Sequence, residues 1–384
     1  MGIQRPIYLD CNATTPVSPE VLSAMLPFFT DYFGNPSSLN HSYGWEAEAG
    51  IEKARETLAE AIAAQPTEVI FTSGATEANN LAIKGVAESY MSAGRHIITI
   101  KTEHNAVLDP CRYLEQLGFN VTYLPVAPDG LIDLQQLENA LQSDTILVSI
   151  MAANNEIGVL QPIEQIGQMC HDRDILFHTD AAQALGKIPL NVQTQSIDLL
   201  SMTAHKLYGP KGIGALYVRR KNPRVQVSPQ LHGGGQEKGL RSGTLYTPQI
   251  VGFGEAVRIA IGEIESESKR LKELRDRLWK DLSKLPGACL NGHATQRLAN
   301  NLNVSFEGIE GARLLLDVRD AIAVSSGSAC SSSNPKPSHV IKALGRSDAI
   351  AKATLRFGLG KETTQVDIER ASQVVSQAVN KQVI

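Results

Sequence analysis

Cysteine is scarce in this chain of 384 residues. Its five cysteines are odd in number, and no two of them form a CxxC pair. This usage excludes a disulfide framework and a zinc cluster, so we expect reduced thiols and no metal site. The five positions are Cys11, Cys111, Cys170, Cys289 and Cys330.

The sequence also lacks basic clusters and long hydrophobic runs. Its formal net charge is -4 and its pI is near 6.2, which argues against nucleic acid or an anionic membrane as the main partner. No apolar run is long enough to span a bilayer, and the opening residues MGIQRPIYLDCNATTP lack the apolar core of a signal peptide. We therefore expect a cytoplasmic protein with no membrane or nucleic-acid partner.

What the sequence does contain is an alternation of short apolar runs and helical patterns. The runs EVIFT, RHIITI and TILVSI each precede a segment with helical spacing, and ILFHTD and IDLLSM follow. This order predicts βαβ units and an α/β fold with a mostly parallel, doubly wound sheet. From about Gly254 a long amphipathic helix leads into a smaller α+β region. We expect a large domain at 17–260 and a small domain from 1–16 and 261–384.

Polar motifs follow several of the predicted strands, where α/β proteins gather their ligands. In SGATEANN, Gly74, Ala75 and Thr76 open a helix whose free N–H groups and dipole suit an anion. In HTDAAQALGK, Asp180 ends an apolar run. Its carboxylate is either a helix N-cap or a partner for a cationic ring nitrogen.

Two further motifs supply an amine and an imidazole. Lys206 in SMTAHKLYGPKGIG stands between an apolar run and a glycine-rich turn, where partial burial would lower its pKa and leave an amine able to form a Schiff base. The alternative is an ordinary surface lysine. His104 in KTEHNAV follows HIITI and is alternatively a helix-start or core histidine. An anion cradle, a carboxylate, an amine and a flat imidazole together match the needs of pyridoxal phosphate.

The stretch SSGSACSSSNPKP at 325–337 places Cys330 among serines, glycine and prolines. Such residues form a loop without competing secondary structure. The thiol is either a mobile nucleophile or a free cysteine on a loop.

Seven motifs in this order resemble those of the NifS/IscS-type cysteine desulfurases, within the class V aminotransferase group of fold type I pyridoxal phosphate enzymes. They are SGATEANN, TEHNAV, NNEIG, HTDAAQ, HKLYGPKG, RSGT and SSGSAC. The resemblance implies a homodimer with the active site at the subunit interface. It implies removal of sulfur from L-cysteine to give L-alanine and a Cys330 persulfide. Acceptor proteins, such as an iron–sulfur scaffold, would then take the sulfur.

The resemblance also implies roles for individual residues. Lys206 is similar to the Schiff-base lysine, and Cys330 to the nucleophile. Asp180 and Gln183 resemble the partners of the pyridine nitrogen and the phenolic oxygen. His104 resembles the histidine stacked on the ring, which also serves as an acid or base. The other implied contacts are Ala75, Thr76, Asn155, Thr203, His205 and the partner subunit's Thr244 for the cofactor, and Asn155 with Arg356 for the amino-acid end of the substrate.

The chain departs from the family pattern at Thr203, which replaces a serine, and at Gln236, where histidine is common. It also ends soon after its last helix, at VNKQVI, without a longer tail that relatives use to dock a scaffold. Two other functions stay open. One is a pyridoxal-phosphate-dependent cystine, cysteine or selenocysteine lyase, or an aminotransferase, without an essential enzyme thiol. The other is a sulfur-relay component whose cofactor site is only structural.

Overall fold

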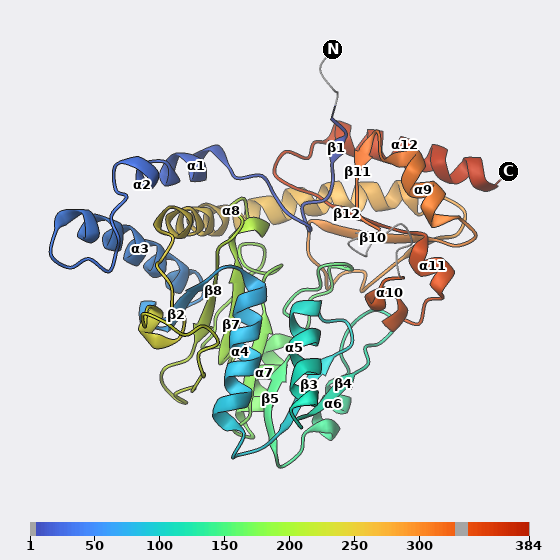
Figure 1. Ribbon diagram of the computed structural model, residues 1–384. Helices are drawn as coiled ribbons and strands as arrows, with labels where there is room; N and C mark the ends of the chain where they lie inside the picture. The colour runs from blue at the N-terminus through green and yellow to red at the C-terminus, as the bar shows by residue number, and fades with distance from the viewer. Residues whose placement is uncertain (1–4, 327–336, 384) are drawn as a thin grey trace.

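The computed structural model describes residues 5–326 and 337–383 and contains a large mixed sheet (Figure 1). Its central strands are parallel, and β8 runs antiparallel to both of its neighbours. The predicted α/β fold with a mostly parallel sheet is therefore confirmed. The strand order is β2 (Val69–Thr72), β8 (Gly214–Val218), β7 (Leu199–Thr203), β6 (Leu176–Asp180), β5 (Thr145–Ser149), β3 (His96–Ile100) and β4 (Asn120–Leu124).

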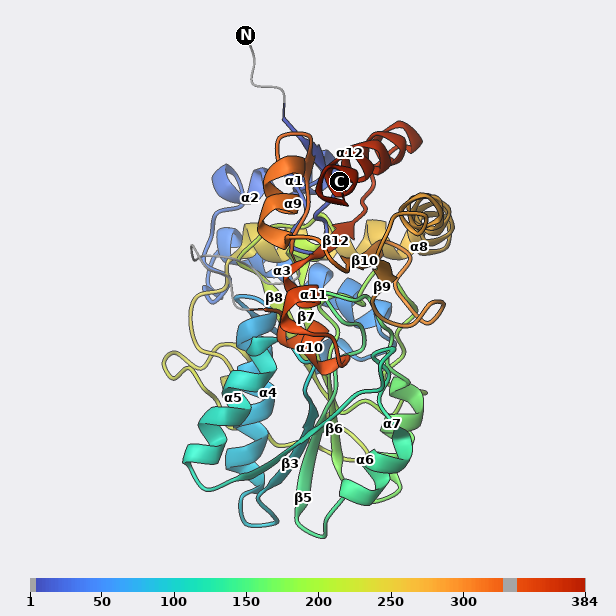
Figure 2. The same ribbon diagram turned by 90° about the vertical axis from the view of Figure 1, so that its right-hand side faces the viewer.

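Helices cover both faces of this sheet, as Figure 2 shows for α4 and α5 on one side and α7 on the other. Successive residues of β3 alternate between the two faces: Ile97 joins the core beneath α4 and α5, whereas Ile98 and Ile100 join the core beneath α7. Burial on both faces explains why the strands read as continuous apolar runs. The covering helices are α3 (Ser42–Ala61), α4 (Ala75–Tyr90), α5 (Asn105–Gln116), α6 (Leu134–Ala140) and α7 (Ile163–His171).

The long helix α8 spans Thr247–Leu282 and so begins before the predicted start at Gly254. Two glycines in its first turns are sites of close packing. A Cβ at Gly252 would lie 2.5 Å from Met25 Sδ, and one at Gly254 would lie 2.7 Å from the Ala54 Cβ. The start of α8 is therefore packed against other helices, whereas its end contributes Leu278 to a separate core.

That separate core surrounds a three-stranded antiparallel sheet. The N-terminal strand joins this region by pairing with β11, which lies near the other end of the chain (Figure 1). A capping box begins the last helix, because Asp367 N–H donates to Thr364 Oγ1 and Thr364 N–H donates to Asp367 Oδ2. The elements are β1 (Ile7–Tyr8), β9 (Ala288–Leu290), β10 (Asn301–Phe306), α9 (Gly311–Val318), β11 (Ile322–Ala323), β12 (Thr354–Gly358) and α12 (Gln365–Val383).

Four short α-helices complete the set of α-helices and strands in the described residues. They are α1 (Pro19–Met25), α2 (Pro27–Thr30), α10 (His339–Ala343) and α11 (Asp348–Lys352). Within residues 5–326 and 337–383, no helix combines the length and the apolar character needed to cross a bilayer. The division into domains at 17–260 and at 1–16 with 261–384 stays a prediction.

Candidate active site

A cavity of about 1050 Å³ lies beyond the carboxyl ends of the sheet strands. Most of the predicted site residues line it, although they come from distant parts of the sequence. Thr244 does not line it, and Cys330 lies outside the described residues. The predicted residues that line it are Ala75, Thr76, His104, Asn155, Asp180, Gln183, Thr203, His205, Lys206 and Arg356.

The N-terminus of α4 opens onto this cavity. Gly74 is the N-cap residue, with φ 154°, and no described side chain makes a capping hydrogen bond there. A Cβ at Gly214 would lie 2.6 Å from Gly74 Cα, so strand β8 approaches this turn closely. The first N–H groups of a helix have no partner within the helix, and the helix dipole adds positive potential. The turn therefore fits a phosphate group, with the Ala75 and Thr76 amides beside it.

Asp180 lies at the end of β6 with only 5 % of its surface exposed. Its Oδ1 accepts a hydrogen bond from Ala182 N–H at 2.8 Å, and its Oδ2 accepts one from Asn79 Nδ2 at 2.7 Å. The residues that follow form turns, so Asp180 is not the N-cap of a helix. A carboxylate accepts about four hydrogen bonds, so it keeps capacity for a cationic ring nitrogen in the cavity.

Lys206 follows β7 in a short 3-10 turn and is largely buried. Its Nζ donates to the carbonyl oxygens of Asn12 and Ala13 at 2.5 and 2.6 Å. Burial, with the nearby cations Lys187 and Arg356, lowers the pKa of Lys206 to about 7. An amine with that pKa is partly neutral near neutral pH and can act as a nucleophile or a base.

His104 is the N-cap of α5, where its Nδ1 accepts a hydrogen bond from Ala106 N–H at 3.0 Å. The helix-start interpretation is therefore confirmed, and the same side chain also lines the cavity. Burial lowers the pKa of His104; Asp180 acts against this change, and Lys206 acts in the same direction as burial. Because Nδ1 accepts, the neutral ring carries its hydrogen on Nε2.

Arg356 on β12 is held in place by three groups. Its guanidinium donates to Asp10 Oδ1 at 2.8 Å, to the Asn155 carbonyl at 3.0 Å and to Ser325 Oγ at 3.1 Å. Arg356 Nε and Asn155 Oδ1 are buried, and neither has a hydrogen-bond partner among the described residues. Leaving such groups unpaired is costly, so the cavity suits a polar ligand that offers an acceptor to Arg356 Nε and a donor to Asn155 Oδ1.

Glu156 also lines the cavity, although the sequence analysis gave it no role. It accepts a hydrogen bond from Ser338 Oγ at 2.5 Å, and Asn301 and Asn303 donate to its carbonyl oxygen. Burial raises the pKa of Glu156 to about 7, although Ser338 and Arg356 act against that rise. The motif NNEIG contained this residue, but burial, which makes it notable, is not visible in a sequence.

The N-terminal segment is the second feature that the sequence analysis missed. Asn12, Ala13 and Thr14 line the cavity, and Thr14 Oγ1 lies 3.1 Å from His205 Nδ1. Together with the helix N-terminus, the carboxylate and the amine, this polar wall fits pyridoxal phosphate: it offers an anion cradle, an acceptor for a ring N–H and an amine for an aldehyde.

Comparisons with known proteins agree with this arrangement. The family model described as aminotransferase class-V matches residues 7–371. The cysteine desulfurase IscS of Methylobacillus flagellatus is 53% identical over 99% of this chain and 94% of its own length, and the same figures hold for that of Neisseria meningitidis serogroup C / serotype 2a.

Solved structures give the same result. A NifS-like protein superposes with a TM-score of 0.91 at 39% identity and covers 98% of this chain and 100% of its own. SspA in complex with cysteine gives a TM-score of 0.81 at 42% identity, with 92% and 98% covered. This chain belongs to the class-V aminotransferase family and, within it, to the NifS/IscS-type cysteine desulfurases.

Proposed function

We propose that this protein is a pyridoxal-phosphate-dependent cysteine desulfurase that converts L-cysteine to L-alanine and leaves the sulfur on Cys330 as a persulfide. The observation that carries the proposal is the single cavity that unites Lys206, Asp180, the open N-terminus of α4 and Arg356. When bound, pyridoxal phosphate supplies an electron sink for charge that develops on the substrate carbon.

Each part of the cavity has a separate task in holding the cofactor. The α4 N-terminus with Thr76, Thr203 and His205 would hold the phosphate. Asp180, already anchored by Asn79, would face the ring nitrogen and keep it protonated. Gln183 would donate to the phenolic oxygen, and His104 would pack against the ring. The Lys206 amine would carry the covalent link to the aldehyde.

Separate residues would bind the carboxylate of the substrate and remove the proton from its α-carbon. Arg356 would bind the carboxylate, since its buried Nε is a donor without an acceptor in the described part of the chain. Asn155 would hold the amino-acid end through its Nδ2 group, because its Oδ1, also without a partner there, can only accept. Lys206, with its pKa near 7, suits the role of the base that takes the proton, and His104 is the second candidate.

The sulfur step needs one thiolate from the enzyme. As the Cys330 sulfur bonds to the substrate sulfur, the carbon–sulfur bond breaks and its electron pair stays on carbon, which then takes a proton to become alanine. The role of Cys330 rests on its motif, SSGSAC, because the residue lies outside the described parts.

We also propose that the protein is a cytoplasmic homodimer in which the partner subunit's Thr244 completes the phosphate site. Thr244 is exposed and does not line the cavity of its own subunit. An exposed apolar surface lies nearby and supports the dimer. Its members include Leu26, Phe29, Tyr32, Phe33, Tyr43 and Tyr246. We further propose that an acceptor protein, such as an iron–sulfur scaffold, takes the sulfur from Cys330.

The first test compares wild type, Cys330→Ala and the control Cys289→Ala. Purified wild type is expected to show a visible absorption band and to release alanine from L-cysteine. Cys330→Ala is expected to keep the band and lose alanine release, whereas Cys289→Ala keeps both. If Cys330→Ala turns over L-cysteine as fast as wild type, the enzyme is a direct lyase and the desulfurase proposal is wrong.

A further inference from the structure

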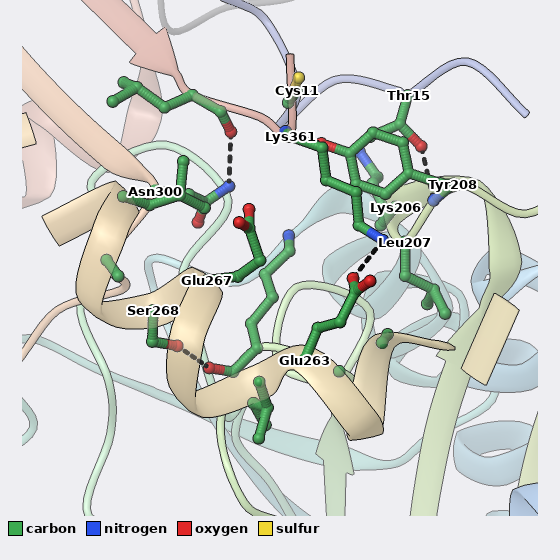
Figure 3. Close-up of a pocket in the computed structure, with 17 residues that line it drawn as sticks. Cys11, Thr15, Lys206, Leu207, Tyr208, Glu263, Glu267, Ser268, Asn300 and Lys361 are labelled. Atoms are coloured by element: carbon green, nitrogen blue, oxygen red, sulfur yellow. Dashed lines mark hydrogen bonds and ion pairs between the residues drawn. The ribbon is translucent and has the colours of Figure 1, made fainter. Parts of the chain in front are cut away.

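A second, smaller cavity of about 60 Å³ lies on another side of Lys206, which lines both cavities (Figure 3). Cys11, Tyr208 and Glu267 surround it, and an ion pair between Lys361 and Glu263 lies at its edge. Lys187 lines this cavity but not the active-site cavity. The sequence analysis gave Lys187 no role.

Lys187 reaches the active site through Gln183. Its Nζ donates to Gln183 Oε1 at 3.1 Å, and its carbonyl oxygen accepts from Ser268 Oγ at 3.2 Å, which fixes its backbone against α8. Gln183 Oε1 also accepts from Asn12 Nδ2 at 3.2 Å. The amide oxygen therefore has two donors, which is its full capacity.

The Gln183 nitrogen has a different set of contacts. Gln183 Nε2 donates one hydrogen to the Asn12 carbonyl at 2.8 Å. An amide nitrogen has two hydrogens, so one N–H is left for a ligand. If the amide were reversed, its NH₂ group would meet the Lys187 amine and the Asn12 NH₂ group, which are both donors. Lys187 thus disfavours the reversed amide.

The charge of Lys187 strengthens this preference. The ion pairs found among the described residues include none to Lys187, and burial lowers its pKa to about 8, with Cys11 opposing that change. The amine is therefore still largely protonated at neutral pH, and an ammonium group has no acceptor to offer a reversed amide. Lys187 is also the largest cationic influence that lowers the pKa of Lys206.

We propose that Lys187 is a positioning residue that fixes the Gln183 amide with its free N–H available to the phenolic oxygen of the cofactor. The inference rests on the proposed function, because that oxygen belongs to pyridoxal phosphate. Lys187 acts from outside the active-site cavity, so it touches neither substrate nor cofactor.

The test uses Lys187→Met, which removes the donor, and Lys187→Arg, which keeps a charged donor. We expect Lys187→Met to weaken pyridoxal phosphate binding by about tenfold and to shift the pH midpoint of the visible band, because a hydrogen bond from a charged group is lost. Lys187→Arg is expected to restore much of both. Thermal unfolding of the cofactor-free proteins identifies a variant that fails to fold.

A double-mutant cycle separates positioning from general damage. If Lys187 acts through Gln183, then Lys187→Met weakens cofactor binding no further in a Gln183→Ala background, whereas the direct effect of its charge on Lys206 persists there. An equal loss of cofactor binding on Lys187→Met in both backgrounds, or no loss in the wild-type background, overturns the inference and leaves the proposed function intact. A wild-type protein that shows no visible band with pyridoxal phosphate overturns both.

Discussion

Glu156→Gln tests whether an acid in the cavity wall keeps its proton at neutral pH. Glu156 is only 5 % exposed, and its Oε2 accepts from Ser338 Oγ at 2.5 Å. Burial raises its pKa from 4.5 to about 7. Glutamine keeps the size and an acceptor oxygen but does not titrate, so the substitution removes only the proton exchange.

The magnitude follows from the two pKa values. Between pH 4.5 and about 7 the folded protein holds a proton that the unfolded chain has released. This contribution to stability is therefore fully present below pH 4.5 and is lost as pH rises through about 7. At about 1.36 kcal/mol for each pH unit, the loss amounts to about 3 kcal/mol.

The assay is chemical denaturation across this pH window. The free energy of unfolding of wild type relative to Glu156→Gln is expected to fall by about 3 kcal/mol between pH 4.5 and about pH 8. The control Glu164→Gln changes an exposed glutamate on α7 and should leave the pH profile of wild type unchanged. Parallel pH profiles for wild type and Glu156→Gln would refute the reasoning.

Three further predictions concern the site and the core. Arg356→Lys is expected to raise the KM for L-cysteine by about tenfold or more, because one ammonium cannot both keep the bonds to Asp10 and Asn155 and present a donor where Nε lies. An unchanged KM in alanine-release kinetics contradicts this. Lys206→Ala is expected to abolish alanine release and the visible band, and a persisting band would remove Lys206 from its proposed role. Glu237→Gln breaks the buried pair with Arg55, whose Nη2 lies 2.8 Å from Glu237 Oε1. It should lower the free energy of unfolding by about 3 to 5 kcal/mol. The control Glu255→Gln breaks a pair with an exposed arginine on α8 and should lower it by at most about 1 kcal/mol. Equal losses of unfolding free energy contradict the burial argument.

Much of the fold was predictable because its central strands are buried on both faces. Continuous apolar runs such as ILFHTD therefore marked strands, and the polar residues that end them marked the site. Asp180, Lys206 and His104 could be placed together since the carboxyl ends of parallel strands meet at one edge of a sheet. The direction of β8 was not predictable, because GALYV has the same apolar pattern in a parallel or an antiparallel strand.

The residues that the sequence did not indicate depend on long-range packing. Glu156 and Ser338 are far apart in sequence, and their contact exists only because α10 packs near the loop that follows β5. Lys187 was given no role by the sequence, and only its contact with Gln183 indicates one. Residue identity predicts chemistry, but burial and partners decide which groups carry shifted pKa values.

The most direct test of the central claim is mass spectrometry of the protein after one turnover with L-cysteine and no acceptor. Wild type is expected to produce alanine and to gain the mass of one sulfur atom on the peptide that contains Cys330. If alanine forms while that peptide stays unmodified, or if the added sulfur lies on Cys11 or Cys289 instead, the proposed persulfide on Cys330 is contradicted.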